Sequence, residues 1–370
     1  MRLAPFELER YFSKYEFTAP FLLCASDCES FSIGEILGLE SGVAEAYAAL
    51  RLGYTESEGS PALREEIAKL YRSIGAGDVL VHAGAEEAVF TFMNACLEPG
   101  DHVVVQSPCY QSLVEVARGV GCEITPWAGT AASGWAPDLN RLEHAISDRT
   151  RAIVINTPHN PTGFAMPAAM QEAIVGLARE RGILLFSDEV YRGLEYDPST
   201  AVPAACDLYE NAVSLGVMSK AYGLAGLRIG WVATRNRQIR DAIWSFKDYT
   251  TICSSGPAEI LARIALANGA TLIGRNLAII RHNLTLLRTF FEAHAEWLRW
   301  TEPVAGPIGF PTLLTGEPVD DFCRRVLSQT GVLLLPGSVY AGASREFRIG
   351  YGRASMPEAL ARLGGWLDQR

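Results

Sequence analysis

A lysine and an arginine lie eight residues apart in the segment 218–230, directly after the apolar run 213–217. Burying an ammonium group costs several kcal/mol unless its charge is neutralised or used. A lysine in an apolar pocket can lose its proton and form a Schiff base with an aldehyde, and an arginine close by can hold a phosphate group. Lys220 and Arg228 are therefore candidates for binding a phosphorylated aldehyde, unless Lys220 is a strand-end residue that reaches solvent.

Other polar side chains follow apolar runs in the same way. Asn160 lies in the segment 156–163, which two prolines and a glycine make rigid. Asp188 follows the run 183–187, and Tyr191 comes three residues later. Taken singly, the asparagine is compatible with an ordinary turn and the aspartate with a helix cap. Their order along the chain, each after a successive strand, favours a shared site.

These residue types match the needs of one cofactor, pyridoxal phosphate (PLP). Its aldehyde requires a lysine, here Lys220. Its ring nitrogen must stay protonated, and a buried carboxylate such as Asp188 favours that charged form. Its phenolic oxygen needs hydrogen-bond donors, which Tyr191 and Asn160 can supply. The four side chains together therefore indicate a PLP site.

The phosphate and the ring of PLP also need partners. A phosphate suits the start of a helix where the backbone can approach closely, as predicted at Gly84, Ala85 and Glu86. Strand–glycine–helix junctions are common, so this feature is weak by itself. Tyr110 offers an aromatic face for the cofactor ring. We therefore expect these residues to join the same site.

Size and composition are those of an ordinary soluble globular protein. The chain has 370 residues, of which 49% are hydrophobic, and a net charge of −10. The acidic balance argues against nucleic acid as a partner. No apolar run approaches the ~20 residues that span a bilayer, and the N-terminal segment is unlike a signal peptide. We expect a cytoplasmic protein that has no membrane partner.

The eight cysteines are scattered along the chain. Cys24 and Cys28 lie four residues apart, but no second pair completes a zinc site. We expect reduced, mostly buried thiols and no bound metal.

Apolar runs alternate with amphipathic helices from about residue 79 onward. The predicted strands are Val79–Ala83, His102–Gln106, Ala152–Asn156, Ile183–Ser187, Ala212–Val217 and Gly230–Thr234. Continuous apolar strands separated by helices predict an α/β fold, with a mostly parallel central sheet covered by helices on both faces. Ligands of such sheets bind at the carboxyl ends of the strands.

The helices suggest how the chain is divided. Ser60 can cap a helix that carries apolar residues as far as Ile74, and a second helix covers Ala168–Arg181. A long helix predicted over Leu272–Trp297 links two domains. We therefore predict an N-terminal arm over residues 1–45, a large domain over 46–271, and a smaller α+β domain over 272–370.

Five segments carry a family resemblance. The segments 156–163, 187–191 and 219–230 resemble the class I/II aminotransferases of the fold-type I PLP-dependent enzymes. The segment 54–59 is similar to the family segment whose tyrosine reaches the cofactor phosphate of a neighbouring subunit. The segment 348–352 is similar to the one whose arginine grips the substrate α-carboxylate. The resemblance covers roughly the whole chain.

This resemblance implies a homodimer with two shared active sites, acting on an L-amino acid and an oxoacid. It implies roles in catalysis and ring binding for Lys220, Asp188, Asn160 and Tyr191. It places the phosphate among Gly84, Ala85, Arg228, the Ser219 hydroxyl, and Tyr54 of the partner subunit. It assigns the substrate carboxylate to Arg348, with Asn160 beside it.

One position departs from the family. Many relatives carry a phosphate-binding serine three residues before the lysine, where this chain has Val217. Without that serine, the binding free energy of the cofactor falls by about the value of one charge-assisted hydrogen bond, 1.5–3 kcal/mol. Ser219 or a water molecule can substitute for it.

The same residues serve two reactions. Transamination is the predicted activity, and a substrate with a leaving group on its β or γ carbon would open an elimination or cyclisation route. The segments 7–12 and 25–31 resemble the arms of capreomycidine and enduracididine synthases, which dehydrate and cyclise hydroxylated arginines. That resemblance implies that Glu9, Asp27 and Glu29 bind a guanidinium group. The alternative is that these three carboxylates are solvated or cap the arm.

A ligand-sensing regulator is a third possibility, because some regulators fuse this fold to a DNA-binding domain. The arm begins at residue 1 and the Tyr54 segment follows it, which leaves no room for a helix-turn-helix domain. The acidic balance also argues against this class. The sequence therefore predicts a PLP-dependent aminotransferase.

Overall fold

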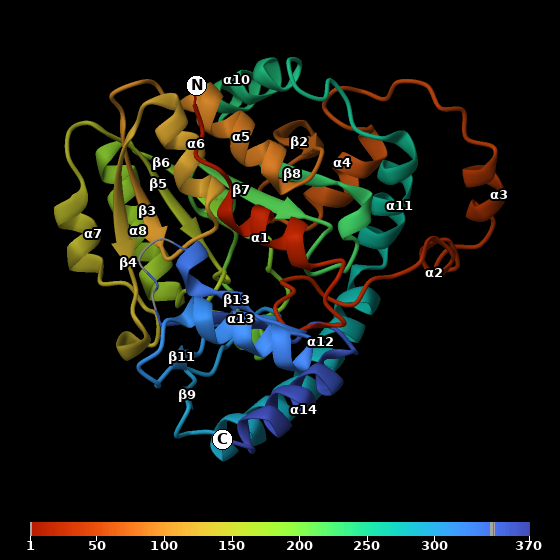
Figure 1. Cartoon of the computed structure of the whole chain (residues 1–370). Helices are drawn as coiled ribbons and strands as arrows, with labels where there is room; N and C mark the ends of the chain where they lie inside the picture. The colour runs from red at the N-terminus through yellow and green to blue at the C-terminus, as the bar shows by residue number, and fades with distance from the viewer. Residues whose placement is uncertain (1, 341–342, 344) are drawn as a thin grey trace.

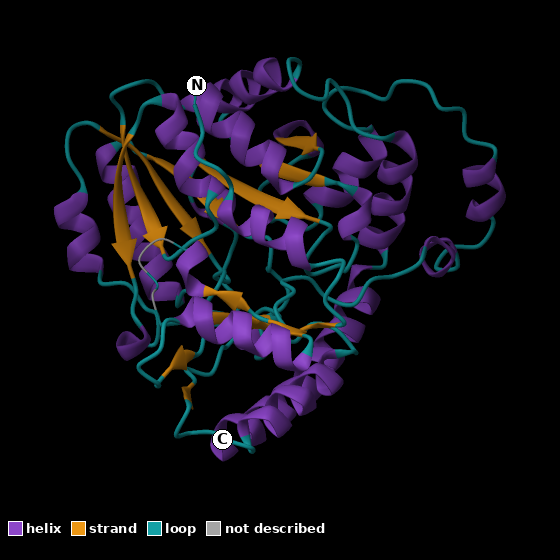
Figure 2. Cartoon of the chain, viewed as in Figure 1, coloured by secondary structure: helices purple, strands orange, loops and turns teal. Residues whose placement is uncertain are grey.

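A seven-stranded sheet forms the centre of the computed structural model, which describes residues 2–340, 343 and 345–370 (Figures 1 and 2). The strand order is β2-β8-β7-β6-β5-β3-β4. Strand β8 runs antiparallel to both of its neighbours, and the strands from β7 to β4 are mutually parallel. The strands are β2 (Val79–His82), β3 (His102–Ser107), β4 (Glu123–Ala128), β5 (Thr150–Asn156), β6 (Leu184–Asp188), β7 (Ala212–Val217) and β8 (Gly230–Ala233).

The sequence predicts six of these strands, and each lies within two residues of its expected ends. Strand β4 was not predicted because it forms the edge of the sheet, where only Trp127 of its six residues is buried. It therefore lacks the apolar run by which the other strands are recognised. The antiparallel direction of β8 has no signature in its local sequence either.

Helices cover both faces of the sheet, as predicted for the fold class. Alternate strand residues join different clusters, so Val103 and Val105 pack with one set of helices and Val104 with another. The first set is α5 (Ala85–Cys96), α6 (Ser112–Val120) and α10 (Arg237–Lys247); the second is α7 (Leu139–Ala145), α8 (Ala168–Arg181) and α9 (Ala205–Leu208). Helix α8 has the predicted bounds.

The C-terminal part is built on small sheets and long helices. Strand β14 (Phe347–Gly350) lies between β10 (Ile308–Gly309) and β13 (Leu335–Pro336), and β9 (Leu298–Arg299) pairs with β11 (Thr312–Leu313). Its helices are α12 (Gly269–Ala293), α13 (Val319–Thr330) and α14 (Met356–Leu367), whereas α11 (Gly256–Ala267) packs against α4 (Pro61–Ala68) of the predicted large domain. The predicted linking helix is α12, which begins and ends a few residues earlier than expected.

The N-terminal arm attaches to this C-terminal part. Strand β1 (Phe21–Leu22) pairs in parallel with β12 (Val332–Leu333), and α1 (Glu7–Tyr15) precedes it. Figure 1 shows the arm crossing between the central sheet and the C-terminal helices. The arm is therefore placed to contact groups from both parts of the molecule.

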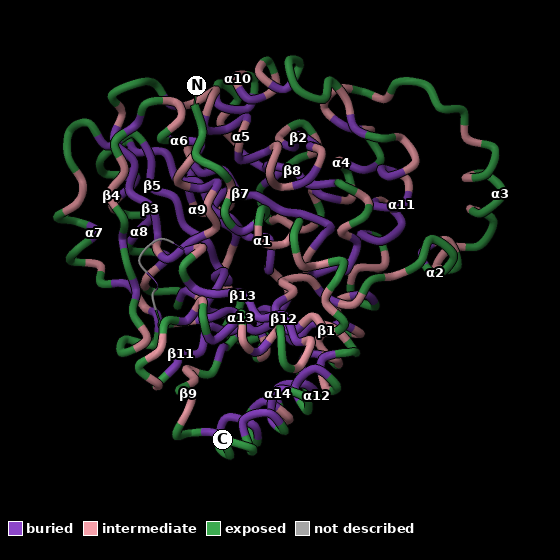
Figure 3. The backbone as a smooth tube through the Cα atoms, in the orientation of Figure 1, coloured by how far each residue is buried: buried purple, intermediate pink, exposed green. Residues whose placement is uncertain are grey.

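A segment with α2 (Ile33–Leu37) and α3 (Val43–Ala48) projects from the body before α4 (Pro61–Ala68), and most of it is exposed (Figures 1 and 3). Ser60 precedes α4 as predicted, but its hydroxyl caps no described residue. Instead its N–H donates to Glu259 Oε2 at 2.9 Å. Helix α4 ends at Ala68, before the predicted Ile74. Within the described residues, no helix is both long and apolar enough to cross a membrane.

Candidate active site

Lys220 follows β7 and contacts the N-terminal arm. Its Nζ donates a hydrogen bond to Ser26 Oγ at 2.9 Å and lies 6.0 Å from the centroid of the Tyr191 ring. Burial lowers the pKa of the Lys220 amine, while the nearby Asp27 carboxylate acts to raise it. The amine is therefore easier to deprotonate than an ordinary lysine, as chemistry at this nitrogen requires.

Asp188 ends β6, which is the neighbour of β7 in the sheet. Its carboxylate is buried and accepts a hydrogen bond from the Val190 N–H at 3.2 Å. Burial raises the pKa of Asp188 to about 7, and the charge of Lys220 only partly offsets this effect. The negative charge of this buried carboxylate is only partly offset by its neighbours. It therefore suits a cationic partner, such as the protonated ring nitrogen of PLP.

Arg348 of the C-terminal part contacts both the arm and the segment that follows β5 of the large sheet. It lies in β14, is 1% exposed, and donates from Nε and Nη2 to the Cys24 carbonyl at 3.0 and 2.9 Å. Its Nη1 donates to Tyr340 Oη at 2.7 Å and to Asn160 Oδ1 at 3.3 Å. Asn160, which follows β5, therefore lies beside the guanidinium group. A carboxylate that binds this guanidinium at two points has to displace the Cys24 carbonyl or the oxygens of Tyr340 and Asn160.

Arg228 lies against the start of α5. Gly84 precedes this helix with a φ of +89°, and a Cβ at position 84 would lie 2.5 Å from Arg228 Nη2. The glycine thus allows the guanidinium to lie beside the first turn of α5, where the backbone N–H groups have no partner within the helix. Positive charge at a helix N-terminus is suited to a phosphate. The structure therefore places Arg228 beside Gly84, and the binding of a phosphate there stays a prediction.

Glu86 has an unusual position for a phosphate site. Burial raises the pKa of its carboxyl to about 7; Glu9 also raises it, and Arg228 lowers it. Glu9 in α1 accepts a hydrogen bond from Tyr110 Oη at 2.9 Å. Tyr110 is therefore held by the arm on the side of the site where Glu86 and Arg228 lie.

The predicted arm carboxylates are engaged by the chain itself. Both oxygens of Asp27 accept from Arg353, at 3.1 and 2.9 Å, and Glu29 Oε2 accepts from the Ala354 N–H at 2.8 Å. A substrate guanidinium would have to displace Arg353 to bind Asp27 in the same way. Glu9, with only Tyr110 as its described hydrogen-bond partner, is the more available of the three.

The remaining predicted residues lie in different environments. Ser219 is buried one residue before Lys220, and Val217 is buried at the end of β7. Tyr191 Oη donates to the Ser26 carbonyl at 3.1 Å. Tyr54 stands apart, with 93% of its side chain exposed between α3 and α4. Its role in a partner subunit's site stays a prediction.

Sequence reasoning did not identify Ser26 or Tyr340. The Ser26 contact with Lys220 joins residues 194 positions apart, and Tyr340 donates to Asn160 Oδ1 at 3.1 Å across 180 positions. No spacing or periodicity marks either residue.

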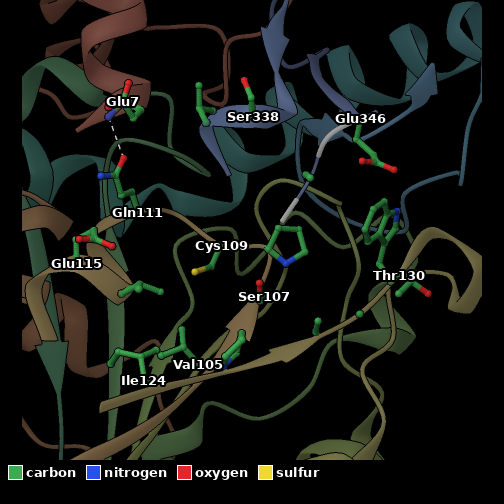
Figure 4. A pocket seen from close by; sticks show the side chains of 18 of the residues that line it. Glu7, Val105, Ser107, Cys109, Gln111, Glu115, Ile124, Thr130, Ser338 and Glu346 are labelled. Atoms are coloured by element: carbon green, nitrogen blue, oxygen red, sulfur yellow. Dashed lines mark hydrogen bonds between the residues drawn. The ribbon is translucent and has the colours of Figure 1, made fainter. Parts of the chain in front are cut away.

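A cavity of about 620 Å³ is lined in part by Cys109 and Gln111, the neighbours of Tyr110 in the sequence (Figure 4). It is lined by residues of the β3–α6 loop, of the segment after β4 and of the C-terminal part, among them Cys109, Trp135 and Glu346. None of its described lining residues is Lys220 or Asp188. The groups suited to chemistry therefore gather at the strand ends and not in this cavity.

The fold and these groups define a PLP-dependent enzyme, because the buried carboxylate and the anion site fit the two ends of the cofactor. Residues 31–363 match the model of the family described as aminotransferase class I and II, and the chain belongs to this family. The enzymes of this family depend on PLP.

Three relatives illustrate the range of the family. Capreomycidine synthase of Streptomyces vinaceus is 31% identical over 361 residues, which cover 96% of this chain and 92% of that protein. A PLP-dependent aminotransferase from Streptococcus suis has a TM-score of 0.94 and 30% identity, over 100% of this chain and 99% of that one. The PLP-dependent cyclase OrfR has a TM-score of 0.90 and 28% identity, over 100% and 98%. The family therefore includes more than one reaction.

Proposed function

We propose that this protein is a PLP-dependent aminotransferase that moves the amino group of an L-amino acid to an oxoacid. The observation that carries the proposal is that Arg348 and Lys220 contact the arm two residues apart, at Cys24 and Ser26. Two residues of extended chain span about 7 Å. An amino acid whose carboxylate binds Arg348 would therefore present its α-carbon toward Lys220.

Each group then has a defined task. PLP, when bound, supplies the electron sink for the α-carbon. Lys220 anchors the cofactor and, once released by the substrate, takes the α-proton on its Nζ. Asp188 keeps its negative charge beside the ring nitrogen, and Arg348 fixes the carboxylate. Gly84, Ala85 and Arg228 hold the phosphate.

A second candidate is elimination or cyclisation of a guanidino amino acid. The similarity to capreomycidine synthase extends over 96% of the chain and so includes most of the arm. Glu9 accepts a hydrogen bond from Tyr110 Oη at 2.9 Å, so its carboxylate lies on the side of the site where Tyr110 stands. The Glu9 carboxylate would then bind the cationic end of the substrate.

Incubation with candidate amino acids, with and without an oxoacid, separates the two reactions. Oxoacid formed only in the presence of an acceptor supports transamination, whereas dehydration or ammonia release without acceptor supports the second candidate. Lys220→Ala should abolish both the activity and the visible absorbance of the bound cofactor. A Lys220→Ala protein that still holds PLP through a borohydride-reducible bond would refute the assignment of the lysine.

We also propose a cytoplasmic homodimer in which each site takes Tyr54 of the partner subunit. The exposure of Tyr54 in the single chain supports this arrangement. Mixing inactive Lys220→Ala and Tyr54→Ala proteins should restore up to half of the activity per mixed dimer, because one of its two sites is then intact. No recovery after subunit exchange would refute the shared site.

A further inference from the structure

Ser26 is the direct hydrogen-bond partner of Lys220. The Ser26 Oγ accepts from Lys220 Nζ at 2.9 Å, and the Ser26 main-chain carbonyl accepts from Tyr191 Oη at 3.1 Å. One arm residue therefore contacts both the lysine and the tyrosine of the site. Its hydroxyl touches the atom at which the chemistry occurs.

The arm around Ser26 is held on both sides. Arg348 donates twice to the Cys24 carbonyl, and Arg353 forms a two-point ion pair with Asp27. The Gly350 N–H donates to the Leu23 carbonyl at 3.0 Å, and any side chain at Gly350 would overlap the Ala25 backbone. The Ser26 backbone therefore has a fixed place, from which its hydroxyl reaches Lys220 Nζ, while the lysine stem is flexible. A fixed partner of this kind can orient a mobile amine.

We propose that Ser26 is a positioning residue that orients the Lys220 amine toward the α-carbon of the substrate. The inference rests on the proposed function, in which Lys220 removes the α-proton. By accepting one N–H of the neutral amine, the hydroxyl directs the nitrogen lone pair away from the arm. Without the hydroxyl the amine samples other directions, and the reactive orientation becomes less frequent.

The experiment uses the full-length protein loaded with PLP. Ser26→Ala and Ser26→Thr are compared with Ser30→Ala, a matched control on the same arm, where the side chain is exposed. The measured quantities are the exchange of the α-hydrogen of an amino acid with D₂O, the KM and the PLP affinity. A further readout needs no turnover: the rate at which the apoprotein acquires visible absorbance when it is mixed with PLP.

Ser26→Ala should lower the α-hydrogen exchange rate and the rate of PLP attachment about tenfold, the loss expected for one hydrogen bond. KM and PLP affinity should stay within about twofold, Ser26→Thr should recover most of the rate, and Ser30→Ala should match the wild type. Unchanged rates in Ser26→Ala would overturn the proposal. So would a loss of PLP affinity as large as the loss of rate, because that result indicates a structural role.

The two proposals fail in different ways. Exchange of the α-hydrogen is common to transamination and elimination, so it does not depend on which reaction follows. A wild-type protein that exchanges no amino acid would refute the proposed function. A wild-type protein that exchanges normally, with Ser26→Ala equally fast, would refute only the role of Ser26.

Discussion

Replacing Asp188 by asparagine should stabilise the cofactor-free protein at pH 8 and impair the PLP-bound enzyme. Burial raises the pKa of Asp188 from an ordinary 3.8 to about 7. The folded state therefore binds more protons than the unfolded state between these two values, and its stability falls as the pH rises from about 4 to about 7. Above about pH 7 Asp188 is ionised in both states, and the loss of stability no longer grows with pH.

The magnitude follows from the two pKa values. A rise from 3.8 to about 7 corresponds to at most about 4 kcal/mol at pH 8. Asparagine has nearly the same shape and can still accept from the Val190 N–H. We therefore expect Asp188→Asn to raise the free energy of unfolding by about 1–4 kcal/mol at pH 8. At pH 5 the rise should be only about a third as large, because the carboxyl is ionised in the unfolded state but still largely protonated in the folded state.

Urea denaturation of the apoprotein at pH 5 and pH 8, followed by tryptophan fluorescence, measures this difference. Asp197→Asn is the control, because Asp197 is exposed and hydrogen bonds from Ser199 lower its pKa. It should not stabilise the protein at either pH. The reasoning would be refuted if Asp188→Asn raised the free energy of unfolding equally at both pH values, or lowered it at pH 8. In the PLP-bound enzyme the same substitution should lower α-hydrogen exchange about a hundredfold, because the ring nitrogen loses its anionic partner.

Three further substitutions test the two ends of the proposed site. Gly84→Ala should lower PLP affinity at least about tenfold, because its Cβ would lie 2.5 Å from Arg228 Nη2 and its φ of +89° is unfavourable for alanine. A fluorescence titration with an unchanged dissociation constant would contradict the anion site. Val217→Ser should raise PLP affinity about tenfold in the same titration by adding a phosphate donor, and a weaker complex would show that the hydroxyl does not reach the phosphate. Arg348→Lys should raise the KM for the amino acid about a hundredfold, because lysine lacks the two-point geometry. An equal loss of PLP affinity would argue against a substrate role for Arg348.

Much of the large sheet could be predicted because parallel strands are buried on both faces. Strands β5, β6 and β7 are therefore continuous apolar runs, and the polar residues at their carboxyl ends are easily recognised. Lys220, Asp188 and Asn160 follow directly from that pattern. Strand β4 did not, because an edge strand with an exposed face has a mixed sequence.

The sequence by itself determined which residues lie at the strand ends, since strand burial and turn chemistry are local properties. It could not determine which groups face one another across the two parts of the molecule. Arg348 meets Cys24 across 324 positions, Arg353 meets Asp27 across 326, and Lys220 meets Ser26 across 194. These contacts depend on how the arm pairs with β12 and lies over the large sheet. Only the tertiary structure therefore decided that the arm holds the lysine and that Asp27 is already paired, because both depend on long-range packing that no local pattern records.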